Sequence, residues 1–374
     1  MSQFSHTKTL FHLPSNVVYL DGNSLGPMPL AAREHVATMM GNEWGEQMIK
    51  GWNNAGWMSL STQIGDRIAP LIGAEPGHVI MGDTLSIKVH QALAAALALN
   101  PGRKVILSDY GNFPSDLYMA QGLIKTLDRG HTLKTVAPED VSHHIDDQVA
   151  VLMLTEVDYR TGRKHDMQAL TATAHAHGVI TLWDLAHSVG ALPVDLVGSN
   201  VDFAVGCTYK YLNGGPGAPA FIYVCPAYVN KVDSSLSGWL GHAAPFDFEL
   251  DYRAAPGIER LRVGTPPVIA LKCLEPALDI WDLVTIDQVR KQSIALCELF
   301  IREVEARCPS LTLNSPRNAQ ERGSQVSFCF EEGYGVIQAM AERGVIGDFR
   351  APDNMRFGFA PLYIDENDVI TAAT

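Results

Sequence analysis

The segment "VAVLMLTEVDYRTG" at residues 149–162 begins with a nearly continuous apolar run and ends in polar residues. A strand that is buried on both faces, in the middle of a parallel sheet, has this composition. The next segment, "MQALTATAHAHG" (167–178), has the spacing of an amphipathic helix and ends in glycine, and "VITLWDLAHSVG" (179–190) begins a second apolar strand. This order of strand, helix and strand is typical of a parallel α/β layer.

The same alternation of strand and helix extends from about residue 78 to residue 225, and the order of the predicted elements changes after about residue 265. Long helical runs at 266–309 then precede the strand-like "SQVSFCFEE" (324–332) and "MRFGFAPLY" (355–363). We therefore predict an α/β fold with a large, doubly wound, mostly parallel-sheet domain and a smaller α+β domain. The expected limits are 1–45 for an N-terminal segment that packs with the small domain, 46–264 for the large domain, and 265–374 for the small domain, with an incomplete C-terminal helix.

Length and composition exclude several classes of protein. A single hydrophobic core seldom extends over a chain of 374 residues, which favours two domains. The net charge of −13 argues against a nucleic-acid or anionic-membrane partner. The six cysteines form no CxxC pair, and the longest apolar stretch, residues 92–99, is too short to span a bilayer. We expect a cytoplasmic protein with reduced thiols and no membrane or nucleic-acid partner.

Polar residues that could carry chemistry follow several of the predicted strands. In open α/β sheets, ligands bind at the carboxyl ends of the strands, so these residues are expected to meet in one crevice. They are Thr84, Phe113, Thr155, Asp184, His187 and Lys210. An amine for an aldehyde, a carboxylate for a pyridine nitrogen, an aromatic side chain and a helix N-terminus for a phosphate together suit pyridoxal phosphate. Taken singly, each has an ordinary explanation as a helix cap, a turn residue, a core histidine or a solvated lysine; only the combination points to the cofactor.

Eight segments of the chain resemble the kynureninases, which are aminotransferase-like pyridoxal-phosphate enzymes of fold type I. They are "YLDGNSLGPMP" (19–29), "GWNNAGW" (51–57), "NFPSDLYMAQGL" (112–123), "HDMQAL" (165–170), "WDLAHSVGALPVDL" (183–196), "GCTYKYLNGGPG" (206–217), "SGWLGH" (237–242) and "MRFGFAPLY" (355–363). The resemblance runs from about residue 11 to residue 364. It implies hydrolysis of L-kynurenine, or its 3-hydroxy form, to anthranilate, or 3-hydroxyanthranilate, and L-alanine in tryptophan degradation.

The resemblance also implies roles for individual residues. Lys210 would form the Schiff base with the cofactor, Asp184 would pair with the pyridine nitrogen, and Tyr209 would bind the phosphate and move protons. The other residues expected around the cofactor are Thr84, Leu85 through its backbone, Phe113, Pro114, Ser115, Asp116, Thr155 and His187. Arg356, Trp57 and Asn23 would bind the substrate, with Arg356 on its α-carboxylate. The family forms homodimers that share the site, and Trp239 and Thr265 would complete the phosphate site of the neighbouring subunit.

The chain departs from the kynureninase pattern at two places, and three other functions remain as alternatives. Leu85 stands where some relatives have threonine, and "IDENDV" (364–369) departs from the usual continuation. Trp57, together with Thr265, favours unhydroxylated kynurenine, although Trp57 could also be a core residue. The alternatives are a cysteine desulfurase, an aminotransferase, or a non-catalytic homologue that acts as a binding protein. No metal is expected, because His175 and His177 fall on different faces of a predicted helix and lack partners at zinc spacing.

Overall fold

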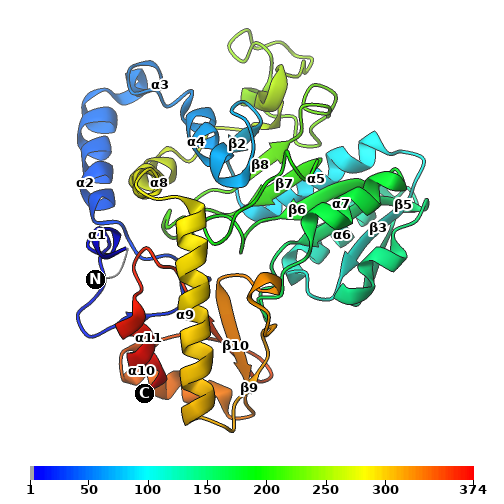
Figure 1. Cartoon of the computed structure of the whole chain (residues 1–374). Helices are drawn as coiled ribbons and strands as arrows, with labels where there is room; N and C mark the ends of the chain where they lie inside the picture. Colours follow the sequence, from blue (N-terminus) through cyan, green and yellow to red (C-terminus); the bar gives the residue numbers. More distant parts are fainter. Residues whose placement is uncertain (1–3) are drawn as a thin grey trace.

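A seven-stranded sheet forms the centre of the computed structural model, which describes residues 4–374 (Figure 1). In chain order its strands are β2 (Val79–Met81), β3 (Val105–Asp109), β4 (Thr132–Val136), β5 (Val149–Thr155), β6 (Ile180–Asp184), β7 (Phe203–Gly206) and β8 (Phe221–Val224). Their order across the sheet is β2-β8-β7-β6-β5-β3-β4, and only β8 runs antiparallel to its neighbours. The predicted mostly parallel α/β sheet is confirmed.

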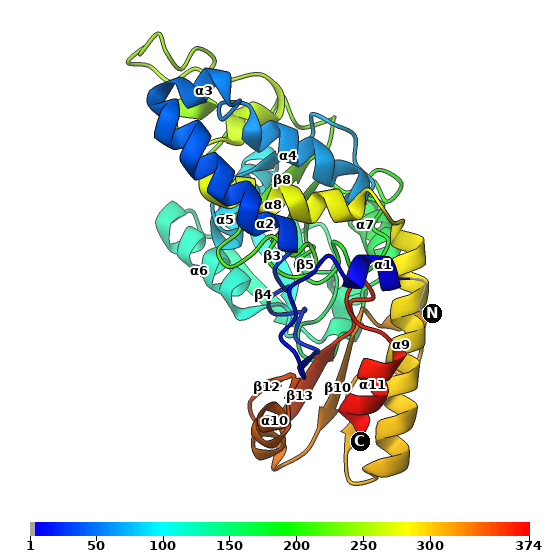
Figure 2. The same ribbon diagram turned by 90° about the vertical axis from the view of Figure 1, so that its left-hand side faces the viewer.

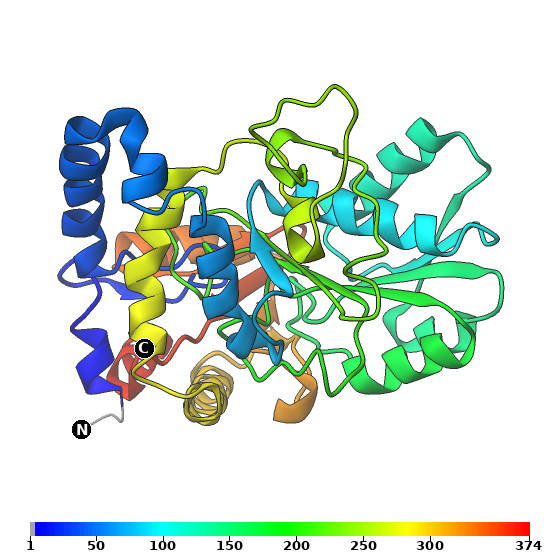
Figure 3. The ribbon, with the colours of Figure 1, turned by 90° about the horizontal axis from the view of Figure 1, so that it is seen from above.

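Helices cover both faces of this sheet, as the apolar strands require (Figure 3). Along β5, Leu152 and Leu154 belong to one hydrophobic cluster, whereas Val151 and Met153 belong to the other. The first cluster includes residues of α4 (Leu60–Ile68), α7 (Met167–Ala176) and α8 (Val268–Trp281). The second includes residues of α5 (Leu85–Leu99) and α6 (Pro114–Leu127). Alternate side chains of one strand therefore pack into separate layers, which explains why the strand has almost no polar positions.

A second, antiparallel sheet lies below the first and belongs to the C-terminal part of the chain (Figure 2). Its order is β12-β13-β10-β9. The elements of this region are α9 (Ile286–Arg307), β9 (Thr312–Leu313), β10 (Gln325–Cys329), α10 (Gly333–Glu342), β11 (Val345–Ile346), β12 (Asp348–Arg350), β13 (Asn354–Gly358) and α11 (Glu366–Ala373). Helix α9 begins with a capping box between Thr285 and Gln288 and packs beside α11.

The N-terminal residues contact this C-terminal region. Strand β1 (Val18–Tyr19) pairs in parallel with β11, and Lys8 in α1 (Ser5–Lys8) forms ion pairs with Asp365 and Asp368 at the start of α11. The residue limits proposed for the domains stay a prediction. Within residues 4–374, no helix has both the length and the apolar composition needed to cross a membrane.

The helical segment that follows residue 30 is interrupted. Helix α2 (Leu30–Thr38) continues into the wider π-helix η1 (Met39–Glu46), and the 3₁₀ turn η2 (Met48–Lys50) leads into α3 (Gly51–Asn54). Gly41 and Gly45 lie in the π-helical part, where their low helix propensity weakens regular α-helical winding. The remaining short helical turns are η3 (Ala69–Ile72), η4 (Pro138–His144), η5 (Trp239–Gly241), η6 (Gly257–Leu261) and η7 (Ala319–Glu321).

Candidate active site

The carboxyl ends of the parallel strands meet at one edge of the large sheet and form a cavity. Thr155, the last residue of β5, pairs in register with Asp184, the last residue of β6, and Lys210 follows the end of β7 by four residues. The cavity has a volume of about 500 Å³ and contacts both sheets. Its lining residues are Asn23, Ser24, Thr84, Leu85, Ser86, Phe113, Ser115, Thr155, Tyr159, Asp184, Ala186, His187, Tyr209, Lys210, Gly217, Ala218, Arg350 and Arg356.

Most of the residues predicted from the sequence line this cavity, but five do not. Asp116 is buried in the first turn of α6, close enough to Asp184 and Lys210 for their charges to affect it, and Pro114 precedes it in the same turn. Trp57, Trp239 and Thr265 lie elsewhere. Their predicted roles, like those of the lining residues, stay predictions.

The three distant residues have their own surroundings. The indole Nε1 of Trp57 donates to Glu43 Oε2 at 2.7 Å. Trp239 lines a separate surface hollow and packs edge-on against Phe246. Thr265 lies beside a third, small hollow that Lys88 also lines. None of the three contributes to the cavity of its own chain.

Several lining residues were missed by the sequence-based prediction. Tyr159 follows the end of β5 by four residues, so its position after a buried strand could have indicated it. Ser24 follows Asn23 in the turn at residues 22–24, within the quoted segment "YLDGNSLGPMP", and Ser86 lies in the first turn of α5. Arg350 had no local signal, because only the packing of β12 beside β13 brings it to the cavity.

Lys210 contacts a neutral histidine inside the cavity. Burial, followed by the charge of Lys210, lowers the pKa of His187 well below its ordinary value. The Lys210 Nζ therefore donates to the unprotonated Nε2 of His187 at 2.9 Å. The opposite ring nitrogen, Nδ1, is buried and has no partner among the described residues. On the other side of the lysine backbone, Gly26 packs so closely that a Cβ would lie 2.4 Å from the Lys210 carbonyl oxygen.

Asp184 is a buried carboxyl group that is held by one strong hydrogen bond. Its Oδ1 accepts from the backbone N–H of Ala186 at 2.8 Å, and the residue is 3% exposed. Burial raises its pKa to about 6, although the charge of Lys210 acts in the opposite direction. Burial, followed by the charge of Asp184, also raises the pKa of Asp116 well above its ordinary value. A carboxylate in such surroundings is stabilised by a cationic N–H partner.

The N-terminus of α5 supplies the anion-binding end of the cavity. Thr84 is the N-cap residue, and its hydroxyl accepts from the N–H of Ile87 at 3.5 Å. The first N–H groups of a helix have no partner within the helix, and the helix dipole favours an anion there. Thr84, Leu85 and Ser86 all line the cavity at this point. Phe113 lies nearby, with its ring edge-on to that of Tyr159.

Arg356 supplies a buried guanidinium group at the opposite end. Its Nη1 donates to the carbonyl of Tyr159, and its Nη2 donates to Asp348 and, at 3.2 Å, to Ser24 Oγ. The arginine is 1% exposed, and its Nε has no partner among residues 4–374. The nearby Asn23 Oδ1 is also buried without a partner. These unsatisfied atoms, with Nδ1 of His187, suit a polar ligand in the cavity.

The residues present fit pyridoxal phosphate. An amine, a buried carboxylate, an aromatic ring and a helix N-terminus line one cavity, which is the donor set that this cofactor requires. Two solved structures share the fold over most of both chains. A C-DES mutant with glycine covalently linked to its PLP cofactor is 18% identical, with a TM-score of 0.85 over 96% of each chain. The apo cysteine desulfurase of Thermococcus onnurineus NA1 is 17% identical, with a TM-score of 0.83 over 100% of this chain and 96% of that one.

The fold and the site together define a pyridoxal-phosphate-dependent enzyme of fold type I. The chain is 49% identical over 366 residues to the kynureninase of Pseudomonas fluorescens, covering 96% of this chain and 88% of that protein. It belongs to the kynureninase family. The kynureninase of Burkholderia pseudomallei (strain 1106a) is similar to the same extent, and residues 289–374 match the family model for the kynureninase C-terminal domain.

Family membership confirms the predicted cofactor, pyridoxal phosphate, and the predicted class of enzyme. The cysteine desulfurase alternative is not favoured, because the likeness to those structures at 17–18% identity concerns the fold alone. No cysteine lines the cavity formed by the described residues.

Proposed function

We propose that this chain hydrolyses L-kynurenine to anthranilate and L-alanine, with Lys210 and Asp184 as the principal catalytic residues. One water is consumed, and the bond between Cβ and Cγ of the substrate is broken. The observation that carries the proposal is the convergence of Lys210, Asp184 and Arg356 on one cavity in a chain that belongs to the kynureninase family.

When bound, pyridoxal phosphate supplies an electron-accepting ring that stabilises negative charge at the substrate Cα. Lys210 is the amine in the cavity that is placed to bond the cofactor aldehyde. With cofactor and substrate bound, its Nζ would move the Cα proton. His187 supports this exchange because a neutral imidazole accepts a hydrogen bond from Nζ without competing for the cofactor.

Asp184 keeps a proton on the cofactor ring nitrogen. Its pKa is raised to about 6, so the carboxylate is ionised at neutral pH and gains from a positively charged neighbour. The neighbouring Cys207, followed by burial, raises the pKa of the Tyr209 phenol. The phenol is therefore protonated at neutral pH, which suits a donor to the cofactor phosphate and to Cβ of the substrate, the carbon that becomes the methyl group of alanine.

Arg356 binds the α-carboxylate of the substrate. A guanidinium group is a planar fork that pairs well with a carboxylate. In this structure the Nε of Arg356 is unpartnered, whereas both Nη groups donate hydrogen bonds within the chain. In the structure, Asp348 occupies one Nη group and keeps the guanidinium oriented before the substrate arrives. Asn23, which is buried beside Gln325, supplies a further polar atom to the amino-acid end of the cavity.

The active form is proposed to be a homodimer with shared sites. Trp239 and Thr265 lie outside the cavity of their own chain, which supports their contribution to the neighbouring subunit. Trp57 is proposed to favour unhydroxylated kynurenine. A cytoplasmic location is supported by the six cysteines, which are all free thiols in the structure.

A direct assay tests the proposal. The purified protein with pyridoxal phosphate is given L-kynurenine, and anthranilate is followed by its fluorescence; a parallel series with 3-hydroxykynurenine compares kcat/KM. Lys210→Ala is expected to lower turnover by about 10⁴-fold or more, because the proton-transfer group is lost. The matched control, Lys134→Ala in β4, is expected to retain wild-type turnover. Formation of anthranilate at wild-type rate by Lys210→Ala would refute the proposal.

A further inference from the structure

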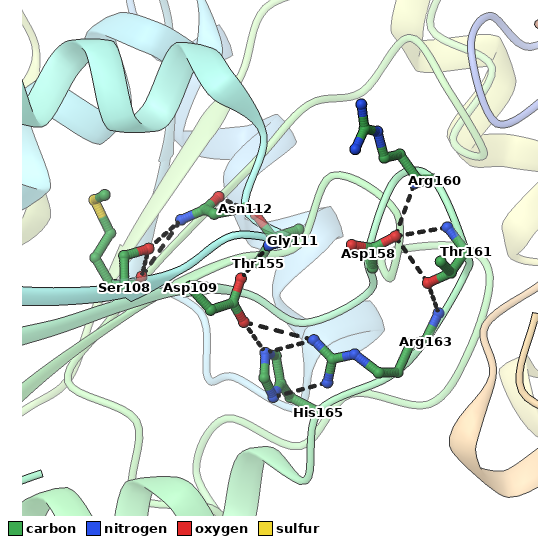
Figure 4. A network of polar contacts seen from close by, with 11 residues as sticks. Ser108, Asp109, Gly111, Asn112, Thr155, Asp158, Arg160, Thr161, Arg163 and His165 are labelled. Carbon is green, nitrogen blue, oxygen red and sulfur yellow. Dashed lines mark hydrogen bonds and ion pairs between the residues drawn. The ribbon is translucent and has the colours of Figure 1, made fainter. Parts of the chain in front are cut away.

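A buried hydrogen-bonded network joins the end of β3 to the end of β5 (Figure 4), where Thr155 lies beside Asp184. It consists of Ser108, Asn112, the carbonyl of Met153, and Thr155. Ser108 is fully buried, Asn112 is 2% exposed and Thr155 is 5% exposed. Bulk water therefore does not compete for these hydrogen bonds, and their direction is set by the groups present.

The direction of each bond follows from a single fixed acceptor. The Met153 carbonyl can only accept, so Ser108 Oγ donates to it at 2.7 Å. Asn112 Nδ2 then donates to Ser108 Oγ at 2.9 Å, and it lies 3.4 Å from the same carbonyl. The amide oxygen of Asn112 consequently faces Thr155, whose Oγ1 lies 2.6 Å away and must donate to it.

This leaves Asp184 without a donor from Thr155. The Thr155 hydroxyl has one hydrogen, and Asn112 takes it at 2.6 Å, whereas Asp184 Oδ2 is 3.4 Å from the same oxygen. The remaining hydrogen bond to Asp184, from the Ala186 N–H, reaches Oδ1. Oδ2 is therefore kept free for an N–H group of a ligand.

We infer that Asn112 is a positioning residue: by holding the hydroxyl hydrogen of Thr155, it reserves Asp184 Oδ2 for the ring N–H of the cofactor. The inference rests on the role proposed for Asp184. Without Asn112, the Thr155 hydroxyl turns to Asp184 Oδ2 and stabilises the carboxylate, so that the carboxylate gains less from pairing with the ring N–H.

The loop that carries Asn112 is also fixed from its other side. Asp109 Oδ1 accepts from the Gly111 N–H at 2.8 Å, and Asp109 Oδ2 lies 2.5 Å from His165 Nε2 (Figure 4). A Cβ on Gly111 would lie 2.5 Å from Asp158 Oδ2, so the backbone there has little room to shift. Asn112 is thus presented to Thr155 by a rigid turn, as a positioning role requires.

A double-mutant cycle with cofactor affinity as its readout tests the inference. The variants are Asn112→Ala, Thr155→Val and the double variant, and the dissociation constant of pyridoxal phosphate is measured by absorbance titration of each apoprotein. Asn112→Ala is expected to weaken binding about tenfold, because a hydrogen bond to a charged group is weakened. In the Thr155→Val background the same change is expected to alter affinity less than about twofold, because no hydroxyl can turn to Asp184.

A cofactor analogue and a network control separate this role from loss of packing. With an analogue that has carbon in place of the ring nitrogen, Asn112→Ala is expected to bind as the wild type does. Ser108→Ala, which disturbs the same network but leaves the bond from Thr155 to Asn112, is expected to keep wild-type affinity. Should Asn112→Ala fail to fold, Asn112→Ser also withdraws the oxygen from Thr155 and is expected to give the same tenfold loss.

Equal losses in the two Thr155 backgrounds, or an equal loss with the analogue, would overturn the inference and leave Asn112 a packing residue. The proposed function fails in a different way. If the absorbance of pyridoxal phosphate bound to the wild type is unchanged in Lys210→Ala, the assignment of the site is wrong whatever Asn112 does.

Discussion

The carboxyl edge of the large sheet and the loop at residues 239–252 differ in how their side chains are held. At the sheet edge, Asp184 is 3% exposed and is held by hydrogen bonds within the chain. In the loop, Phe246 and Phe248 are 59% and 73% exposed. Exposed aromatic groups gathered in one segment are typical of a surface that another chain covers. One chain therefore holds the groups at the sheet edge by itself, whereas the exposed loop is the surface that the proposed second copy would cover.

The largest effect is expected at the sheet edge. Asp184→Asn removes a buried carboxylate, and the partner charge on the cofactor ring is left unpaired. Breaking such a buried pair costs 3–5 kcal/mol, which corresponds to a fall in kcat of about 10³-fold. Steady-state kinetics with L-kynurenine measure it, and Asp140→Asn, at an exposed position, is the control. A loss of less than tenfold would show that the sheet edge does not carry the chemistry.

The next effect concerns the buried guanidinium between the two sheets. Arg356→Lys keeps the positive charge but loses the planar fork, so kcat/KM is expected to fall about 10²-fold, mainly through KM. Arg343→Lys, at an exposed position outside the cavity, is the matched control and is expected to change kcat/KM by less than about threefold. An equal effect of the two substitutions would contradict the assignment of the α-carboxylate to Arg356.

Mixed oligomers test whether the loop serves the neighbouring subunit. Lys210→Ala and Trp239→Ala chains are each expected to be nearly inactive alone. If the site is shared, random mixing gives hybrid dimers with one intact site, and about a quarter of wild-type activity returns. Denaturation and co-refolding of the two variants, followed by the anthranilate assay, measure the recovery. Activity that stays at the level of the separate variants would place Trp239 outside the neighbouring site.

The smallest effect on turnover is expected from a second buried acid at the sheet edge, Glu156. Burial raises its pKa to about 7, above the ordinary value of 4.5. The folded state therefore favours the protonated form, and its contribution to stability, complete below pH 4.5, is lost as the pH rises through 7. At pH 8, the free energy of unfolding of Glu156→Gln, measured by urea denaturation, should exceed that of the wild type by about 3 kcal/mol. At pH 4.5 the two should differ little. Exposed Glu139→Gln serves as the control, and a difference that is independent of pH would contradict the shift.

The sheet edge could be predicted from the sequence because its signals are local. Asp184 and Thr155 each end a run of apolar residues, and parallel strands place such ends together. The direction of β8 could not be predicted, since "PAFIYV" is equally apolar in either direction. Arg350 was missed for another reason. It reaches the cavity through the pairing of β12 with β13, and both strands come long after the last strand of the large sheet in the sequence.

Asn112 shows a finer limit of sequence-based reasoning. Its residue type and its place before Phe113 were visible, but its function depends on which side of the amide faces Thr155. That orientation is set by a carbonyl on β5, 41 residues away in the chain. The residues expected across a subunit boundary, Trp239 and Thr265, could be proposed only from the family resemblance, because nothing local connects them to the cavity.

Chemical trapping of the bond between Lys210 and the cofactor is the decisive measurement. The purified protein with pyridoxal phosphate is treated with borohydride, which fixes any cofactor bonded to an amine, and its peptides are mapped by mass spectrometry. The label is expected on the peptide that contains Lys210. A label on another lysine, such as the buried Lys88 beside the α5 N-terminus, or no label at all, would contradict it.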